Sequence, residues 1–259
     1  MDILKRTFTA YRISVVVEPP PANVLSQRLR DRLAGDTVRG VEIRGAETVS
    51  GADAGALTAV DWQIVSADNG ESDLHHGGAG PTHRVEIIYE RGGCLAYLFV
   101  SRKLLLFSGP APVRGTFVRF LTQALDTRAS VLVPDSDTLA GVFEAWLGGQ
   151  QDDESATTLS AAQKDVVITL RFGDEAGGGA LRTLDITIPA EDISAFAGTA
   201  GGVRFSDRLA SYLDKHLALN IKHADVRIAK ISCGGFVLGE GKVKLLDEAK
   251  VAEILDGIK

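Results

Sequence analysis

The chain has 259 residues, of which 45% are hydrophobic and 24% charged, and its formal net charge is −6. This balance is typical of a soluble globular protein, and the length suits one large domain or two of ordinary size. Because neither half of the chain is basic, broad electrostatic binding of nucleic acid is not the default expectation. No apolar run approaches the ~18–20 residues of a membrane helix, so no membrane contact is expected.

The first half of the chain predicts mainly strands with two helices. Runs rich in β-branched or apolar residues predict strands at 9–17, 38–44, 56–66, 83–90, 94–101 and 103–108. Leucines at helical spacing predict a helix that begins near Asn23 and ends at Gly35, and a second apolar stripe predicts a helix over 117–125. Because short turns join most of the strands, the sheet should be mainly antiparallel with helices on one face.

The second half predicts two hairpins and three helices. The hairpins are expected at 165–188 and 224–246. A short helix should start at Pro189, and a longer one should be capped by Ser206 and bury Leu209, Tyr212, Leu213 and Leu217. A last helix, with Asp247 at its start, should bury Val251, Ile254, Leu255 and Ile258.

A linker-like segment divides the chain. Residues 149–164 follow an amphipathic helix, have no hydrophobic periodicity, and mix glycine, acids and small hydroxyl residues. The sequence therefore predicts an α+β fold with two domains, 1–148 and 165–259, each a mainly antiparallel sheet with helices packed on one face.

Two acids at the end of a predicted strand are the strongest catalytic candidates. Asp135 and Asp137 follow the run Val131–Val133. This pattern resembles the first motif of haloacid-dehalogenase-type phosphatases and the acid pairs of nucleotidyltransferases, and either resemblance implies a Mg²⁺ site. Pro134 interrupts the strand, however, and no later acids complete the motif. The start of a helix also explains these two acids, because acidic side chains cap and stabilise helix N-termini. We favour the cap.

Three histidines in one Gly-rich loop are the candidate metal ligands. His75, His76 and His83 supply imidazole nitrogens that Zn²⁺ prefers. Adjacent histidines on such a loop have no fixed geometry, so a solvated loop is the favoured interpretation. No cofactor is predicted.

A possible RNA-binding surface has two parts. Arg28 and Arg32 share one side of the first helix. The stretch from Cys233 through Gly234 and Gly235 to Lys242 and Lys244 resembles the Gly-rich loop of the repeat-associated RNA-binding proteins of CRISPR systems, which implies ferredoxin-like domains. The same residues are typical of a tight hairpin turn, which is the favoured interpretation.

The location follows from the cysteines and the N-terminus. Cys94 and Cys233 lie in different halves, and free thiols in a reducing compartment are favoured over a disulfide. The first residues show no signal peptide, so we predict a cytoplasmic protein.

The absence of a complete catalytic motif favours a non-enzymatic function. The sequence predicts a protein-binding subunit or adaptor of a larger assembly, with another protein or a second copy as partner, since exposed hairpin edges can pair with another chain. The alternatives are a metal-dependent hydrolase and an RNA-binding module. Nucleic acid is not the favoured partner.

Overall fold

The computed structural model describes residues 2–14, 19–38, 54–65, 81–148, 164–173, 181–193, 196 and 204–258. The chain divides into two compact units. Thr7–Leu132 form the N-terminal unit, while Met1–Arg6 and Val133–Ile258 form the C-terminal unit.

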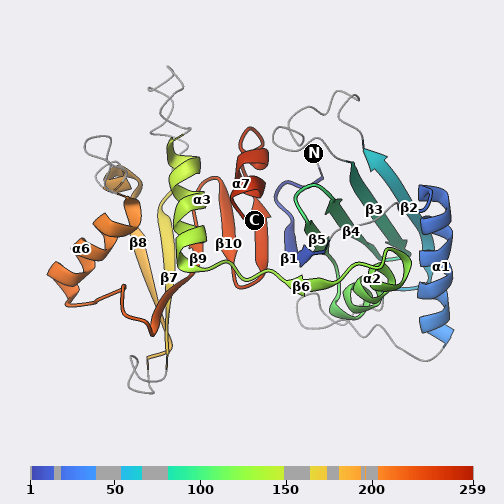
Figure 1. Cartoon of the computed structure of the whole chain (residues 1–259), viewed down its shortest axis with the longest axis horizontal. Helices are drawn as coiled ribbons and strands as arrows, with labels where there is room; N and C mark the ends of the chain where they lie inside the picture. Colours follow the sequence, from blue (N-terminus) through green and yellow to red (C-terminus); the bar gives the residue numbers. More distant parts are fainter. Residues whose placement is uncertain are drawn as a thin grey trace. The chain divides into compact units, whose positions relative to one another are not determined.

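The N-terminal unit is built on an antiparallel sheet (Figure 1). Its strands are β1 (Thr7–Ile13), β2 (Leu57–Val65), β3 (Thr82–Tyr89), β4 (Gly92–Phe99), β5 (Leu104–Ser108) and β6 (Ala129–Val131). The strand order is β2-β3-β4-β5-β1, and β6 pairs with β1. Short connections join β3 to β4 and β4 to β5, as expected for antiparallel neighbours.

Two helices pack against this sheet, α1 (Ala22–Val38) and α2 (Ala111–Ala124). The Trp62 ring of β2 lies 6.1 Å from the rings of both Phe117 and Phe120 of α2. Leu25 and Leu29 of α1 are fully buried in the same core. The helical stripes read from the sequence are therefore the faces that cover the sheet.

The C-terminal unit is also built on antiparallel strands. Its strands are β7 (Val166–Phe172), β8 (Thr183–Ile188), β9 (Val226–Ser232), β10 (Phe236–Gly239) and β11 (Lys242–Leu245). Their order is β11-β10-β9-β7-β8, which leaves β8 at one end. The N-terminal residues belong to this unit, because Leu4 forms a parallel bridge with Leu245 and the Ile3 side chain is fully buried.

The described helical elements of this unit are α3 (Ser136–Gly148), the 3-10 turn η3 (Ala190–Asp192), α6 (Phe205–Leu217) and α7 (Val251–Gly257). Trp146 of α3 lies edge-on to Phe236 of β10, with ring centroids 6.3 Å apart. Its indole nitrogen donates a hydrogen bond to the Asp247 carboxylate at 3.3 Å. A Cβ on Gly235 would lie 2.2 Å from that nitrogen, so the turn before β10 packs directly beneath the indole. Trp146 thus joins α3 to the β10–β11 hairpin and the start of α7.

Helix α3 begins with a side-chain cap. The Asp135 carboxylate accepts a hydrogen bond from the Thr138 backbone N–H at 2.8 Å, and the Asp135 carbonyl accepts one from Leu139. The hydrogen bond from Thr138 lowers the pKa of Asp135. Asp135 therefore satisfies one of the free N–H groups at the helix start.

The structure confirms the α+β class and the antiparallel pairing. The proposed boundaries 1–148 and 165–259 stay a prediction, and α3 lies in the C-terminal unit with α7 and β9. The linker at 149–164, apart from Lys164, lies outside the described residues. Of the predicted strand at 38–44, Val38 is the last residue of α1 and the others lie outside the described residues. The predicted cap at Ser206 is wrong, because Arg204 takes the cap position and has no side-chain cap bond.

We predict that Gly235→Ala destabilises the C-terminal unit by about 1–3 kcal/mol, because the added methyl group overlaps the Trp146 ring. Chemical unfolding followed by tryptophan fluorescence measures this. Gly141→Ala is the matched control: it lies within α3 with open space around it, and it should stabilise by about 0.5–1 kcal/mol. Equal effects of the two substitutions would contradict the packing described here.

We predict that Asp135→Ala costs about 1 kcal/mol of unfolding free energy at neutral pH, and that Asp135→Asn costs much less, because asparagine also caps. The pKa of Asp135 is lowered in the folded chain, so its carboxylate stabilises the fold above the unfolded value of 3.8. That contribution is lost as the pH falls through the folded pKa. Urea unfolding at several pH values should show the alanine deficit shrinking below about pH 4. A pH-independent deficit would contradict a charged cap.

Candidate docking site

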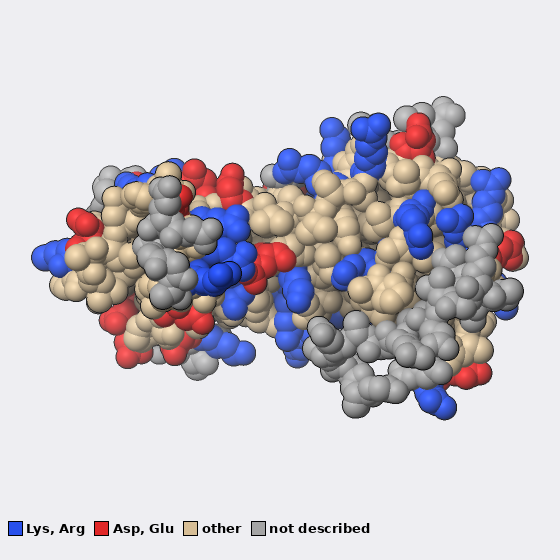
Figure 2. Space-filling model, turned by 90° about the horizontal axis from the view of Figure 1, so that it is seen from below, with Lys and Arg blue, Asp and Glu red and all other residues tan. Residues whose placement is uncertain are grey.

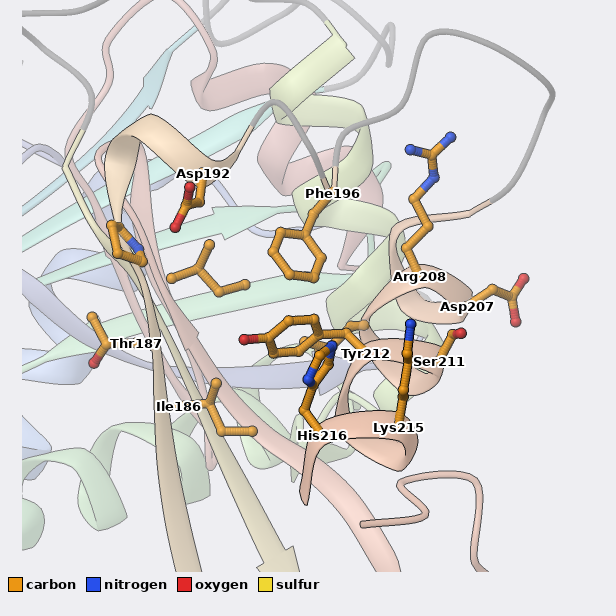
Figure 3. Close-up of a pocket in the computed structure, with 13 residues that line it drawn as sticks. Ile186, Thr187, Asp192, Phe196, Asp207, Arg208, Ser211, Tyr212, Lys215 and His216 are labelled. Atoms are coloured by element: carbon orange, nitrogen blue, oxygen red, sulfur yellow. The ribbon is translucent and has the colours of Figure 1, made fainter. Parts of the chain in front are cut away.

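A groove lies between the edge strand β8 and helix α6 in the C-terminal unit (Figure 3). Its volume is about 670 Å³. Ile186 and Thr187 of β8 lie on one side, and the Phe196 and Tyr212 rings lie on the other. Asp192 stands at one end of the groove. The groove is therefore apolar along β8 and the rings, with the Asp192 carboxylate at one end and Lys215 and His216 on its α6 side.

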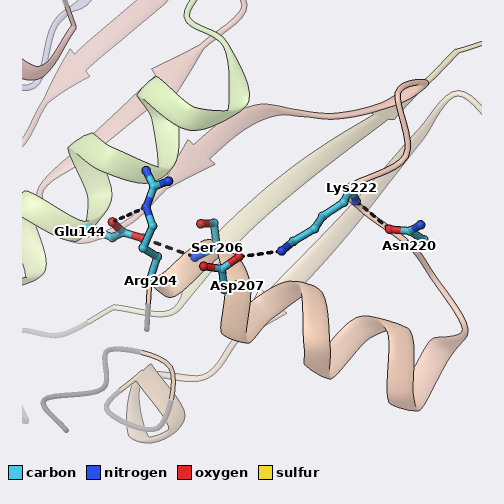
Figure 4. A network of polar contacts seen from close by, with 6 residues as sticks. All are labelled: Glu144, Arg204, Ser206, Asp207, Asn220 and Lys222. Atoms are coloured by element: carbon cyan, nitrogen blue, oxygen red, sulfur yellow. Dashed lines mark hydrogen bonds and ion pairs between the residues drawn. The ribbon is translucent and has the colours of Figure 1, made fainter. Parts of the chain in front are cut away.

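The first turn of α6 is held in place by polar contacts on both sides (Figure 4). Glu144 of α3 lies 4.0 Å from the Arg204 guanidinium and accepts a hydrogen bond from the Ser206 N–H. The Lys222 ammonium lies 2.7 Å from the Asp207 carboxylate, and this contact lowers the pKa of Asp207. Exposed pairs of this kind add little stability singly, so we assign them an orienting role.

A row of aromatic rings connects the core of this unit to the groove. Phe143 packs against Phe205 with centroids 4.7 Å apart, and Phe205 lies 6.4 Å from Phe196. Phe196 then meets Tyr212 edge-on at 5.4 Å, and Tyr212 packs on His216 at 4.6 Å. Phe143 and Phe205 are buried, whereas the Tyr212 side chain is 47% exposed. The buried rings of Phe143 and Phe205 thus support Phe196 and Tyr212 from the core side, while Tyr212 is open to solvent.

The outer edge of β8 has no strand partner in the described part of the chain. The Phe172 N–H donates to the Arg182 carbonyl at 3.0 Å, which marks these two residues as a hydrogen-bonded pair. In an antiparallel ladder such pairs recur at every second residue. The main-chain groups of Thr183, Asp185 and Thr187 must therefore point away from β7, toward the free edge.

The free edge is acidic. Between Thr183 and Ile193 the chain has three acids, Asp185, Glu191 and Asp192, and no lysine or arginine. The Asp185 carboxylate accepts a hydrogen bond from the Thr169 hydroxyl at 2.6 Å. No described residue makes a hydrogen bond or an ion pair with the Asp192 carboxylate. An approaching chain would meet negative charge at this edge.

The predicted acid pair does not meet other ligands. The Asp135 carboxylate is engaged as the cap of α3, and Asp137 lies in the first turn of that helix. Within the described ranges, no group of three or more His, Cys, Asp or Glu side chains is placed to hold a metal ion. A magnesium site at Asp135 and Asp137 stays an untested prediction, while the geometry agrees with a helix start.

The predicted histidine cluster is described only at one member. His75 and His76 lie outside the described residues. His83 is fully buried in β3, where its Nδ1 accepts a hydrogen bond from the Trp62 indole at 3.0 Å. Burial lowers its pKa, which favours the neutral ring. His83 is placed as a core residue of the N-terminal unit.

The predicted RNA-binding residues fall in different units. Arg28 is exposed on α1, and Arg32 donates a hydrogen bond to Gln123 of α2 at 2.9 Å. On the face shown in Figure 2, basic side chains form separate groups and no continuous stripe.

The Cys233 stretch is a tight turn of the C-terminal unit. Cys233 is buried, and burial raises the pKa of its thiol to about 11. The Gly235 carbonyl accepts hydrogen bonds from Leu246 and Asp247, while Gly234 is partly exposed in the turn. Lys242 is exposed and Lys244 half-buried on β11. Cys94 and Cys233 are both buried, and neither forms a disulfide.

Sequence reasoning missed the groove because it assigned Tyr212 and Leu217 to the core. Leu209 and Leu213 of the same stripe are buried as predicted, but Tyr212 is half-exposed and Leu217 is 59% exposed. The sequence did offer one signal: the apolar stripe on this helix is wider than the helix needs to cover the core of its unit. Phe196 and Asp192 belong to no sequence motif that would mark them as part of a site.

A comparison with family models gives a match over residues 2–256, to the family described as centromere protein L. A search of curated proteins finds no match. No helix within the described ranges has both the length and the apolar character needed to cross a bilayer.

The family match corrects one prediction and supports another. The cytoplasmic location is wrong, because centromere components lie in the nucleus. The nucleus is also a reducing compartment, so free thiols do not separate the two locations. The predicted role as a subunit of a protein complex is confirmed at that level. Since the match spans nearly the whole sequence, the chain belongs to the centromere protein L family and is a subunit of a centromere complex.

Proposed function

We propose that this chain is a non-enzymatic adaptor that binds another subunit of the centromere complex through the β8 edge and the β8–α6 groove. The observation that carries the proposal is that the outer edge of β8, beside an exposed aromatic surface, has no strand partner among the described residues. The family match supports the setting, a protein complex at the centromere.

Strand addition suits this edge physically. An incoming extended segment can satisfy the outward main-chain groups of Thr183, Asp185 and Thr187, which gives affinity largely independent of sequence. Side chains at alternate positions of that segment face the same side as Ile186 and enter the groove, which gives specificity. Exposed edges of this kind are usually protected, and a permanent partner is one way to protect them.

The groove supplies the apolar contact that strand addition alone lacks. Tyr212 presents its ring to solvent, and its packing against Phe196 and His216 limits its freedom before binding. Half-exposed aromatic residues of this kind dominate the energetics of protein interfaces, because they bury a large area with few rotatable bonds. The groove and the edge thus form one continuous surface.

We predict that Thr187→Pro weakens assembly into the centromere complex about ten-fold or more, because it removes an outward N–H and reshapes the edge. The β7–β8 ladder should persist, since this N–H does not bond β7. The measurement is the amount of centromere subunits that co-purify with tagged variants expressed at equal levels.

Thr187→Ala is the matched control, because it removes the same side chain and keeps the N–H. It should assemble like the unmodified chain. Circular dichroism must show that both variants are folded. If the proline variant assembles as well as the alanine variant, β8 is not the docking edge.

A further inference from the structure

The β8 side of the groove has the chemistry to select a charged side chain. Asp192 stands at this side of the hollow, near Phe196, whereas Lys215 and His216 of α6 border the other side (Figure 3). Asp207 and Arg208 of α6 also border the groove, but Figure 3 shows both pointing away from it. Asp207 is moreover paired with Lys222.

The aromatic rings favour the same kind of ligand. The faces of tyrosine and phenylalanine rings carry negative charge density and attract an ammonium or guanidinium group. Phe196 and Tyr212 meet edge-on at 79°, so their faces are turned in different directions around the same hollow. A carboxylate next to such rings adds an ionic partner for a cation and repels an acid.

The strand beside the groove carries the same charge preference. Asp185, Glu191 and Asp192 make the segment from β8 through η3 acidic, with no basic residue between Thr183 and Ile193. An acidic partner strand would meet repulsion at Asp185 and near Glu191 and Asp192, whereas a basic one would be attracted there. Lys215 borders the groove on its α6 side, which leaves the β8 side as the acidic one.

We propose that the partner segment is a basic extended strand of a protein, and that it places a lysine or arginine side chain in the groove against Asp192, beside the contacting rings of Phe196 and Tyr212. This inference rests on the proposed docking at β8 and specifies the chemistry of the occupant. The aliphatic stem of that side chain lies on Ile186, and the main chain of the strand pairs with the outer edge of β8.

A matched peptide pair tests this with the full chain. The probes are acetyl-Val-Thr-Lys-Thr-Val-amide and the same peptide with norleucine in place of lysine, which keeps the stem and removes the charge. Affinities are measured by NMR titration of the isotope-labelled protein at low salt. The lysine peptide should bind about ten-fold tighter and shift the β8 amide signals.

Variants identify the group that makes the difference. Asp192→Asn should remove most of the preference for lysine over norleucine. Asp214→Asn is the matched control, because it makes the same charge change on α6, away from the residues that line the groove, and should keep the preference.

The outcomes separate this inference from the proposed function. Equal binding of both peptides, with shifts at β8, would overturn the cation selectivity and leave docking at β8 intact. Binding of neither peptide at β8 would count against both. A preference for lysine that survives Asp192→Asn would also overturn the assignment of Asp192.

Discussion

The outer edge of β8, which no described strand pairs with, is the constraint on which the rest of the site depends. Main-chain N–H and C=O groups are obligatory hydrogen-bonding groups, and a strand at the end of a sheet leaves half of them to solvent or to another chain. In the C-terminal unit, β7 satisfies the main-chain groups at Ile186 and Ile188, and those at Thr183, Asp185 and Thr187 face outward. The other features of the site are arranged around this edge. The groove lies beside it, α6 forms the far wall, and the contacts of Glu144 and Lys222 hold α6 at its first turn.

The interior of the C-terminal unit explains why the groove is open. The row of rings from Phe143 through Phe205 to Phe196 supports α6 from the core side. Trp146, whose ring lies 6.0 Å from that of Phe143 on the same helix, packs on Gly235 and Phe236 and donates a hydrogen bond to Asp247. Because the core below α6 is closely packed, the position of the helix is restrained. We therefore expect α6 to stay at the same distance from β8 when no ligand is bound. A preformed groove loses less conformational entropy on binding than one that must assemble.

Much of the fold was predictable from sequence, because hydrophobic periodicity reports local structure directly. The strands from β2 to β5 and both hairpins of the C-terminal unit lie close to their predicted ranges. The cap at the start of α3 was also predictable, although the pattern Asp-x-Asp did not show which acid bonds the backbone. Asp135 does, through Thr138. The role of Gly235 required the structure, since only the packing of Trp146 shows why a side chain cannot fit there.

The site was less predictable, for a physical reason. Periodicity identifies apolar residues on one face of a helix but cannot say whether that face covers its own core or a partner, and Tyr212 and Leu217 were assigned to the wrong class. The nuclear location was also beyond the sequence, because composition and free cysteines fit any reducing compartment.

Hydrogen exchange of the β8 amides, measured in the isolated chain and in the assembled centromere complex, tests the central claim most directly. In the isolated chain, the amides of Thr183, Asp185 and Thr187 should exchange faster than those of Leu184 and Ile186, which face β7. In the complex, the three outward amides should slow by about ten-fold or more, because a partner strand accepts their hydrogen bonds. Unchanged exchange of these three amides on assembly would contradict docking at this edge.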